Sequence, residues 1–448
     1  MKHIAVIDVG KTNAKLALVD AATLEEIAVR TRPNVVLTDG PYPHFDLDGH
    51  FAFFMEVLAE FQTAYGIDAI SITTHGASAT LIDHDGAALP MLDYEFSGPD
   101  SADGYDALRP SFDATGSPRL PLGLNVGAQL HWLFDAHPDL RNQVKAIVTY
   151  PQYWGYRLTG ELATDVTSLG CHTDLWEPQN ERFSALVDSL GIAGLMAPAR
   201  KSSDVLGTIT DVIAKATGIP SGTPVMVGIH DSNASLYPHL LGREGAFSVV
   251  STGTWVICMA MGGSAQRLDP NRDTLMNVNA LGQAVPTSRF MGGREFEIIR
   301  KARDWQATDA DRDSILGGIY LLPAVEPNTG PFAGRAASCV GLARTEGEEL
   351  VALSYYLALM THTCLDLIRA KGPTVIEGPF AKNTDFLAML AAIRPDGVEV
   401  AASATGTSVG AAMLCIPDAK APETTRVTPP EDSRLAAYAT DWWRLVNG

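Results

Sequence analysis

The sequence predicts an α/β protein made of two domains of similar design. The chain has 448 residues, more than one hydrophobic core usually serves, so two domains are expected. Stretches typical of strands alternate with stretches typical of helices in both halves, as in layered α/β folds. A strand–turn–strand pattern near residue 10 also recurs near residue 253. We therefore expect one domain over 1–242 and another over 243–448.

The first copy of this pattern is 3–20, HIAVIDVGKTNAKLALVD, with an apolar strand on each side of a polar turn. Glycine adopts positive φ at no steric cost, so the turn is expected to expose backbone N–H groups as an anion-binding nest. The carboxylate before the glycine is a hard oxygen ligand suited to Mg²⁺, and an ordinary hairpin is the alternative. The residues concerned are Asp8, Gly10, Lys11, Thr12 and Asn13.

A P-loop is excluded for this turn. Gly10-Lys11-Thr12 looks like the end of one, but the motif requires a glycine at position 5, where the chain has Ala5. A P-loop also opens a helix, whereas a second apolar strand follows here.

The second copy of the pattern is 245–260, GAFSVVSTGTWVICMA. Gly253 lies 243 positions after Gly10, about half the length of the chain. This spacing favours a duplication in which each half carries its own phosphate-facing hairpin. Coincidence is the alternative, because strand–Gly–Thr–strand is common in β structure.

Composition limits the partners and the compartment. The net charge of −19 argues against nucleic acid and anionic membrane surfaces, although a local nest can still bind phosphate. The five cysteines are scattered without C-x-x-C spacing, which predicts a reducing compartment and small buried thiols. The chain starts as a strand and has no run of 18 apolar residues, so we expect a cytoplasmic protein without a signal peptide or membrane span.

The remaining elements follow from periodicity and turn residues. Helices are expected at 51–65, 127–135, 140–144, 184–190, 235–241, 348–369, 384–393, 406–414 and 432–446, the eighth with small residues that allow close backbone approach. Strands are expected at 69–76, 80–82, 87–89, 223–228, 374–379 and 398–400. Surface loops are expected at 98–123 and 417–432.

Asp231 is the candidate general base. It follows the strand 225–227, at the carboxyl end where open α/β sheets bind ligands. A carboxylate there can accept the proton of a substrate hydroxyl that attacks phosphorus. The alternative is that Asp231 only caps the helix that follows.

Polar residues end the strand 69–76 and are candidates for a polyol pocket: Thr73, Thr74, His75 and Gly76. His75 is equally interpreted as a hydrogen-bonded interior histidine, and His172 has the same two interpretations. The chain contains no HExxH, no paired Cys/His ligands and no G-x-S-x-G, so zinc hydrolases and serine esterases have no support.

From residue 1 to about 415 the chain resembles the FGGY family of carbohydrate kinases. The segments that carry the resemblance occur in the family's order: Ile7–Asn13, Thr74–Gly76, Leu81–Asp83 with Asp85-Gly86, Arg157–Glu161 with Thr164-Asp165, Gly228–Asp231, Ser251–Trp255 and Gly378–Asn383.

The resemblance implies two ribonuclease-H-like domains of the actin and hexokinase type, with ATP and sugar in the cleft between them. It implies a sugar-binding domain at 1–242, a nucleotide-binding domain at 243–448, Asp231 as general base and Mg²⁺ near Asp8. The implied ATP-binding residues are Gly10, Lys11, Thr12, Asn13, Thr252, Gly253, Thr254, Gly378 and Asn383. The implied sugar-binding residues are Thr74, His75, Gly76, His230 and Asp231.

The turn motifs are most similar to the rhamnulokinase and fuculokinase branch, which favours a ketose phosphorylated on a primary hydroxyl. Three positions depart from the family: 94–98 replaces an aromatic-x-Asp-x-Arg segment, Gln129 replaces a common lysine, and Gly378-Pro379 replaces a Gly-Gly pair. Pro379 lacks a backbone N–H for the nucleotide. These changes indicate an unusual substrate.

Alternative functions stay open on the sequence alone. A polyol kinase of the glycerol or erythritol type fits the same motifs. A sugar- or nucleotide-binding regulator without catalysis fits the altered adenosine loop, and an actin- or chaperone-like ATPase fits the fold. A homodimer is compatible with each of these functions.

Overall fold

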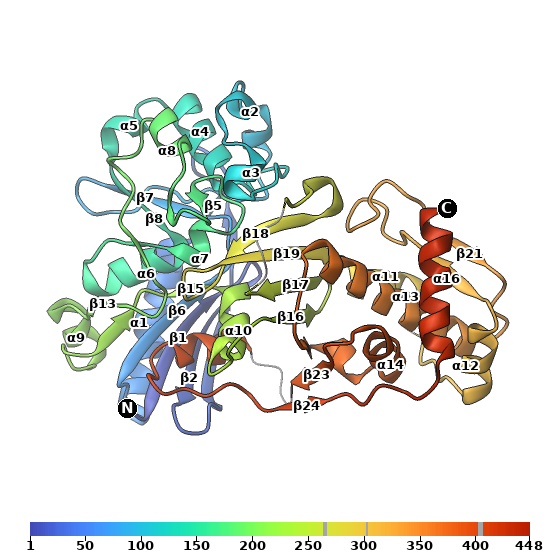
Figure 1. The fold of residues 1–448 in the computed structure, drawn as a ribbon. Coiled ribbons are helices and arrows are strands. Elements are labelled where there is room, and N and C mark those ends of the chain that lie inside the picture. Colours follow the sequence, from blue (N-terminus) through green and yellow to red (C-terminus); the bar gives the residue numbers. More distant parts are fainter. Residues whose placement is uncertain (263–266, 302, 402–405) are drawn as a thin grey trace. The chain divides into compact units, whose positions relative to one another are not determined.

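The structure is a computed structural model that describes residues 1–262, 267–301, 303–401 and 406–448 (Figure 1). The chain divides into two compact units. The first unit is Met1–Gly242 with Met276–Ala284 and Thr405–Ala421, and the second is Arg243–Leu275, Val285–Ala404 and Pro422–Gly448. Two segments of the second half of the chain therefore belong to the first unit. A single domain boundary after residue 242 does not include this exchange of segments.

The first unit is built on a mixed sheet with the strand order β13-β14-β6-β1-β2-β3, and β15 also pairs with β6. The first strand is buried throughout, runs antiparallel to β2 and parallel to β6, and so lies inside the sheet. The bounds are β1 His3–Val9, β2 Asn13–Asp20, β3 Glu26–Pro33, β6 Ala69–Thr74, β13 Val205–Thr208, β14 Pro224–Met226 and β15 Ile229–His230.

Helices and short strands complete this unit. Helix α1 begins at the capping residue Asp46, whose side chain accepts a hydrogen bond from Gly49 N, and its apolar face buries Phe54, Leu58 and Phe61. The helices are α1 Leu47–Ala64, η1 Gly98–Ser101, α2 Tyr105–Leu108, α3 Phe112–Thr115, α4 Val126–Ala136, α5 Leu140–Gln143, α6 Tyr150–Thr159, α7 Val166–Leu169, α8 Leu186–Ser189, α9 Asp211–Thr217, α10 Asp231–Leu240 and α15 Thr407–Met413. The further strands are β4 Val36–Leu37, β5 His44–Phe45, β7 Ala79–Asp83, β8 Val144–Thr149, β9 Thr164–Asp165, β10 Trp176–Glu177, β11 Arg182–Phe183 and β12 Ala199–Arg200.

Helices α10 and α15 pack with their backbones in close approach. A Cβ at Gly410 would overlap the carbonyl oxygen of Ala234, so this contact requires glycine. The close approach predicted from the small residues of 406–414 is confirmed.

The other large sheet has the order β18-β19-β17-β16-β22-β23-β24 and belongs to the second unit except for Met276–Val278 of β18 and Ala284 of β19. Strand β16 is antiparallel to β17 and parallel to β22. The strands of the second half are β16 Phe247–Thr252, β17 Val256–Met261, β18 Thr274–Val278, β19 Ala284–Phe290, β20 Tyr320–Leu322, β21 Ser338–Val340, β22 Thr374–Glu377, β23 Val398–Ala401 and β24 Thr424–Arg426. The helices are η2 Pro270–Arg272, α11 Gly292–Arg300, α12 Asp309–Leu316, α13 Glu346–Leu367, η3 Pro379–Lys382, α14 Thr384–Ile393 and α16 Arg434–Asn447.

Helix α13 forms the core of the second unit. Among the described helices it alone is long and apolar enough to cross a membrane, but 83% of its apolar window is buried within the protein. It packs against α14 and α12, as a core helix does.

The elements agree with the sequence prediction only in part. Helix α14 covers 384–393 as predicted, whereas 87–89 forms no strand and makes only an Ile82–Ala88 bridge. The loop expected at 98–123 contains η1, α2 and α3, and α11, α12, β18 and β19 are among the elements that were not predicted. Helix α6 was missed although its end signals were present, a proline in the first turn and a C-cap at Gly160. Its buried aromatic residues hid the usual periodicity.

Candidate active site

The turn between β1 and β2 is closed by the backbone. Gly10 N donates to Asn13 O at 2.9 Å. Asn34 stabilises the turn with two more hydrogen bonds, from its Nδ2 to Gly10 O and from its backbone N to Thr12 O. Gly10 does not take the positive φ that we expected. The nest proposed for Gly10 is therefore wrong in its backbone geometry, since a nest requires left-handed residues.

Asp8 is nearly buried beside this turn. Its Oδ2 accepts hydrogen bonds from Thr407 Oγ1 at 2.6 Å and Ser408 Oγ at 2.9 Å, and lies 3.2 Å from Lys15 Nζ. Burial opposes the charge on Lys15, but Asp8 and Glu26 raise its pKa above the usual value. No local pattern predicts that α15 supplies two hydroxyls to Asp8 across about 400 residues.

The donor set at Asp8 fits Mg²⁺ only in combination with a phosphate. Within the described residues no three His, Cys, Asp or Glu side chains form a metal cluster. Mg²⁺ usually keeps several waters and binds one or two carboxylates plus substrate phosphates, so a single carboxylate is sufficient.

Lys11 points toward a loop of the same unit. Its ammonium group pairs with Asp93 and with Glu95 at 3.2 Å, and lies 4.7 Å from the centre of the Tyr94 ring. The aromatic ring of Phe45 is at 5.1 Å. The lysine therefore holds part of the segment 94–98, in which the chain departs from the family that it resembles.

His75 ends the strand predicted to line the sugar pocket. It is 6% exposed, donates from Nδ1 to Gly76 O at 2.9 Å, and packs against the rings of Phe45, Tyr94 and Tyr150. Burial lowers the pKa of His75 to about 4, so the ring is neutral at pH 7. Its Nε2 is buried with no hydrogen-bond partner in the described part of the chain, which leaves an acceptor for a ligand hydroxyl. Thr74 precedes it and donates to its carbonyl oxygen.

Asp231 is the first residue of α10, and His230 occupies the N-cap position. Its Oδ1 accepts from Ser232 N at 2.6 Å and from His230 Nε2 at 3.1 Å. The side chain is 31% exposed, which leaves a carboxylate that is oriented yet accessible. The alternative that Asp231 serves only as the N-cap is not supported by this position.

His230 joins Asp231 to a buried thiol. Cys171 Sγ lies 3.7 Å from the same Nε2 atom, and both side chains are buried. Burial would lower the pKa of His230, but Cys171 and Asp231 outweigh it and raise the pKa to about 10, so the ring is an imidazolium. Burial likewise opposes the Cys171 thiolate, while His172 and His230 lower its pKa well below the usual value.

Gly76 makes room for this histidine. A Cβ at Gly76 would lie 2.8 Å from His230 Nε2, closer than side chains tolerate. The structure thus brings together the predicted residues Gly76, His230 and Asp231. It adds Cys171, which was interpreted from sequence as a small buried hydrophobe; no sequence pattern signals a contact 59 residues away. Cys339 is exposed, against the expectation of buried thiols.

In the second unit, the turn between β16 and β17 meets the segment after β22. Gly253 N donates to Trp255 O at 2.9 Å. Thr252 Oγ1 donates to Glu377 O at 2.5 Å and accepts from Phe380 N at 3.1 Å. Gly378 has φ +83°, and a Cβ there would overlap the Thr252 carbonyl oxygen.

A pocket of about 1050 Å³ opens beside these two segments of the second unit. It is large enough for a nucleotide. Of the predicted residues, Gly253, Thr254 and Asn383 line it. Asn383 also caps α14 through Phe386 N at 3.0 Å. The lining residues missed from sequence are Gly293, Arg294, Phe296, Arg300, Trp305, Arg312, Phe380 and Lys382, most of them on α11 and the loop after it.

Two family models match successive parts of the chain. The model of the FGGY family of carbohydrate kinases, N-terminal domain, matches 112–237, and that of carbohydrate kinase FGGY, C-terminal domain, matches 244–424. The chain is 34% identical to a carbohydrate kinase from Novosphingobium aromaticivorans of known structure, with a TM-score of 0.92, covering 99% of this chain and 100% of that one. A xylulose kinase from Lactobacillus acidophilus shares the fold at 17% identity and a TM-score of 0.79, covering 100% of this chain and 98% of that one.

The chain belongs to the FGGY family of carbohydrate kinases. Its architecture is the two-domain α/β fold of that family, of the actin and hexokinase type, as predicted. Among curated relatives it is 27% identical to the L-fuculokinase of Escherichia coli K12 over 271 residues. That match covers 57% of this chain and 56% of the relative, so it spans little more than half the length of either.

Proposed function

We propose that this protein is an ATP-dependent kinase that transfers the γ-phosphoryl group to a primary hydroxyl of a ketose of the rhamnulose, fuculose or xylulose type. The observation that carries the proposal is the carboxylate of Asp231, held by His230 and Ser232 yet 31% exposed at the start of α10. Such a carboxylate can orient an alcohol and accept its proton as the alcohol attacks phosphorus.

The first unit supplies the sugar side in this proposal. The open Nε2 of His75 accepts a sugar hydroxyl, and His230, whose Nε2 lies 3.1 Å from Asp231 Oδ1, orients the carboxylate. The similarity to L-fuculokinases supports a ketose over a polyol.

The second unit supplies the nucleotide side. The pocket beside Gly253 and Asn383 takes ATP, and its cations Arg294, Arg300 and Lys382 match the phosphate charge. Asp8 is the residue that would hold Mg²⁺, which would neutralise charge on the phosphoryl group when bound. The missing N–H of Pro379 is compensated in our proposal by these side chains.

A coupled assay of ADP release tests the proposal. The protein is supplied with ATP and Mg²⁺ and with each member of a panel of ketoses and polyols in turn. We expect a ketose to give the highest kcat/KM, and Asp231→Asn to lower kcat by about 10²–10⁴-fold, the usual contribution of a general base. Asp204→Asn is the matched control, because Asp204 is a surface carboxylate paired with Arg200.

Three outcomes would contradict the proposal. Full activity of Asp231→Asn removes this residue from the mechanism. Thermal stabilisation by ATP and sugars without ADP release supports a binding regulator, and ADP release that needs no sugar supports an ATPase acting on protein partners. A polyol preferred to every ketose overturns the substrate class alone.

A further inference from the structure

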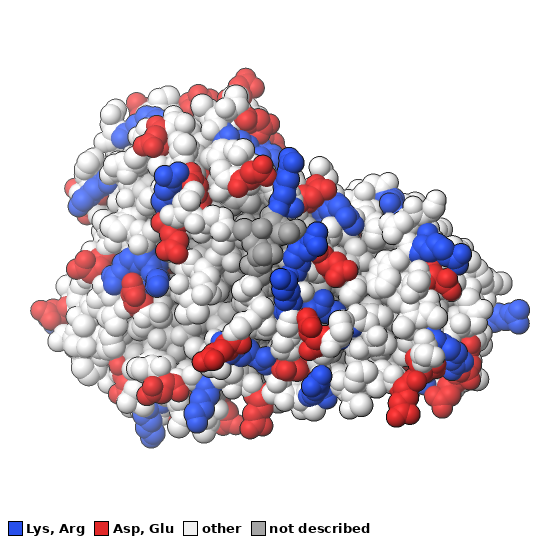
Figure 2. All heavy atoms as spheres, in the orientation of Figure 1, with Lys and Arg blue, Asp and Glu red and all other residues white. Residues whose placement is uncertain are grey.

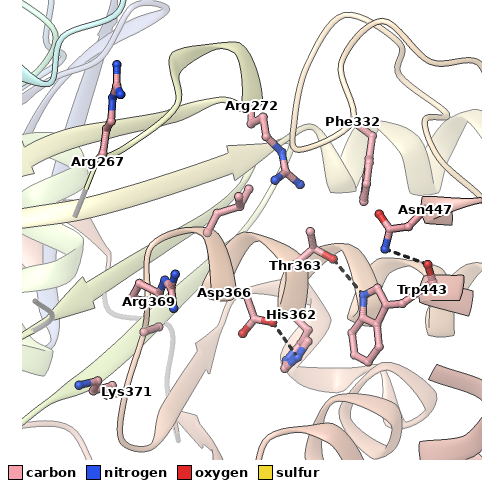
Figure 3. A pocket seen from close by; sticks show the side chains of 12 residues that line it. Arg267, Arg272, Phe332, His362, Thr363, Asp366, Arg369, Lys371, Trp443 and Asn447 are labelled. Carbon is pink, nitrogen blue, oxygen red and sulfur yellow. Dashed lines mark hydrogen bonds and ion pairs between the residues drawn. The ribbon is translucent and has the colours of Figure 1, made fainter. Parts of the chain in front are cut away.

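The second unit holds another hollow, of about 840 Å³, at the carboxyl end of α13 (Figure 3). It shares no lining residue with the pocket assigned to the nucleotide. Its walls come from η2, from the segment around Phe332, from the end of α13 and the loop after it, and from α16. Nothing in the proposed kinase reaction uses it.

The charge of this hollow is opposite to that of the protein. Arg272, Arg369 and Lys371 line it, and none of them has a carboxylate partner within 4 Å in the part of the chain that the structure describes. Many other arginines pair with acids, as Arg109 does with Asp174, and Figure 2 shows Lys and Arg interspersed with Asp and Glu. In a chain of net charge −19, unpaired cations gathered at one hollow favour an anion.

Compensation of the α13 dipole explains only part of this charge. Arg369 and Lys371 follow the helix end at Leu367, where cations interact with the negative pole. Arg272 comes from η2, far from α13 in the sequence. Its Nε donates to Pro331 O at 3.0 Å, and Figure 3 shows its guanidinium directed toward the space between Phe332 and Thr363.

The rest of the lining suits the carbon part of a small ligand. Phe332 and Trp443 contribute ring surfaces, and the indole N–H of Trp443 donates to Thr363 Oγ1 at 3.4 Å. The acidic residue of the lining, Asp366, lies 3.3 Å from His362 Nε2. Arginines, hydroxyls and rings together are the groups that bind organic phosphates.

We propose that this hollow is a binding site for a small organic phosphate, separate from the nucleotide pocket. A phosphorylated sugar and a nucleotide share the phosphate that Arg272 and Arg369 recognise, and their remaining parts contact Phe332 and Trp443. Lys371 also lines the hollow and adds charge. The site requires neither ATP hydrolysis nor a sugar at Asp231.

Isothermal titration calorimetry of the full chain tests the site with three probes: inorganic phosphate, a ketose 1-phosphate and ADP. The titrations contain neither ATP nor a sugar acceptor. We expect an organic phosphate to bind at least tenfold more tightly than inorganic phosphate. The double variant Arg272→Met/Arg369→Met should weaken that binding at least tenfold, and higher salt should weaken it in the wild type. Arg434→Met, which removes a surface arginine paired with Asp432, is the control and should bind unchanged.

Lys382→Met separates the two pockets, because Lys382 lines only the nucleotide pocket. Binding that is lost in Lys382→Met and kept in the double variant assigns the probe to the nucleotide pocket and overturns the proposal. Absence of binding by every probe at 10 mM does the same. If the double variant fails to fold by circular dichroism, Arg272→Gln alone should still lower the affinity at least threefold.

Discussion

The two sheets repeat one topology with different chemistry at the turn. In the first unit the run β14-β6-β1-β2-β3 has two parallel pairings followed by two antiparallel ones, and β23-β22-β16-β17-β19 in the second unit has the same sequence of pairings. Each run also carries an antiparallel edge strand, β13 or β24. The shared topology supports the duplication inferred from Gly10 and Gly253.

The turns differ in what precedes the glycine. Asp8, two residues before Gly10, is a carboxylate bound by Thr407, Ser408 and Lys15. The equivalent position before Gly253 is Ser251, and Thr252 instead fastens the turn to the segment after β22. The comparison shows that the sheet topology determines the position of each turn. Single residues then determine whether the turn presents a carboxylate suited to a metal ion, as at Asp8, or only packs its backbone against a neighbouring segment, as at Thr252.

The largest effect on stability is expected at Gly378, the glycine that the second turn depends on. Gly378→Ala forces a side chain into φ +83° and against the Thr252 carbonyl oxygen, so we expect a loss of about 3 kcal/mol or more. Gly334→Ala is the control, with φ +86° and no atom within 4 Å of the added Cβ, and should cost about 1 kcal/mol. Urea unfolding measures both, and equal losses would show that the contact with Thr252 carries no strain.

His75 in the first unit and Glu295 in the second should respond to pH in opposite directions. Burial lowers the pKa of His75 to about 4 from 6.5, so the folded state binds its proton later than the unfolded state and stability is lost as pH falls from 6.5 to 4. Burial raises the pKa of Glu295 to about 7 from 4.5, so its contribution is present below pH 4.5 and is lost as pH rises through 7. Each contribution is about 3 kcal/mol, from a shift of about 2.5 pKa units.

Unfolding free energies measured from pH 4 to 8 check this contrast. His75→Gln should remove the loss of stability as pH falls from 6.5 to 4, and Glu295→Gln should remove the loss of stability as pH rises from 4.5 through 7. Glu295 is a suitable target because its Oε1 accepts from Glu326 N and from Tyr356, interactions that glutamine can keep through its carbonyl oxygen. Unchanged pH profiles in both variants would contradict the assignment of these two groups.

A smaller effect is expected from exchanging the residues that distinguish the turns. Asp8→Asn keeps acceptors for Thr407 and Ser408 but loses the charge facing Lys15, so we expect about 1–2 kcal/mol of lost stability and a higher Mg²⁺ requirement in the kinase assay. Ser251→Ala, at the matching position of the second turn, should change stability by less than about 0.5 kcal/mol. Equal Mg²⁺ dependence in Asp8→Asn and the wild type would remove Asp8 from metal binding.

The sequence predicted what depends on local signals. The strands around Gly10 and Gly253 and the helix 384–393 follow from apolar patterning and turn residues. Contacts between distant segments carry no local signal, so Cys171 beside His230 and the cations Arg294 and Lys382 of the nucleotide pocket were missed. The φ of Gly10 was predicted wrongly because glycine permits a left-handed conformation without requiring it.

The smallest effect on the free energy of unfolding is expected at Gly10 and Gly253, the two glycines of the repeated turn. Neither Gly10 nor Gly253 has positive φ, and an added Cβ would meet the nearest atom at 3.6 Å and 3.8 Å, both ordinary contacts. Gly10→Ala and Gly253→Ala should each change the unfolding free energy by less than about 1 kcal/mol. If the glycines instead serve close approach of a phosphate, both variants should raise the KM for ATP severalfold while the fold is kept. A loss of stability without a change in KM would mean that the two turns are structural, and that the repeat records a shared fold without a shared role in binding phosphate.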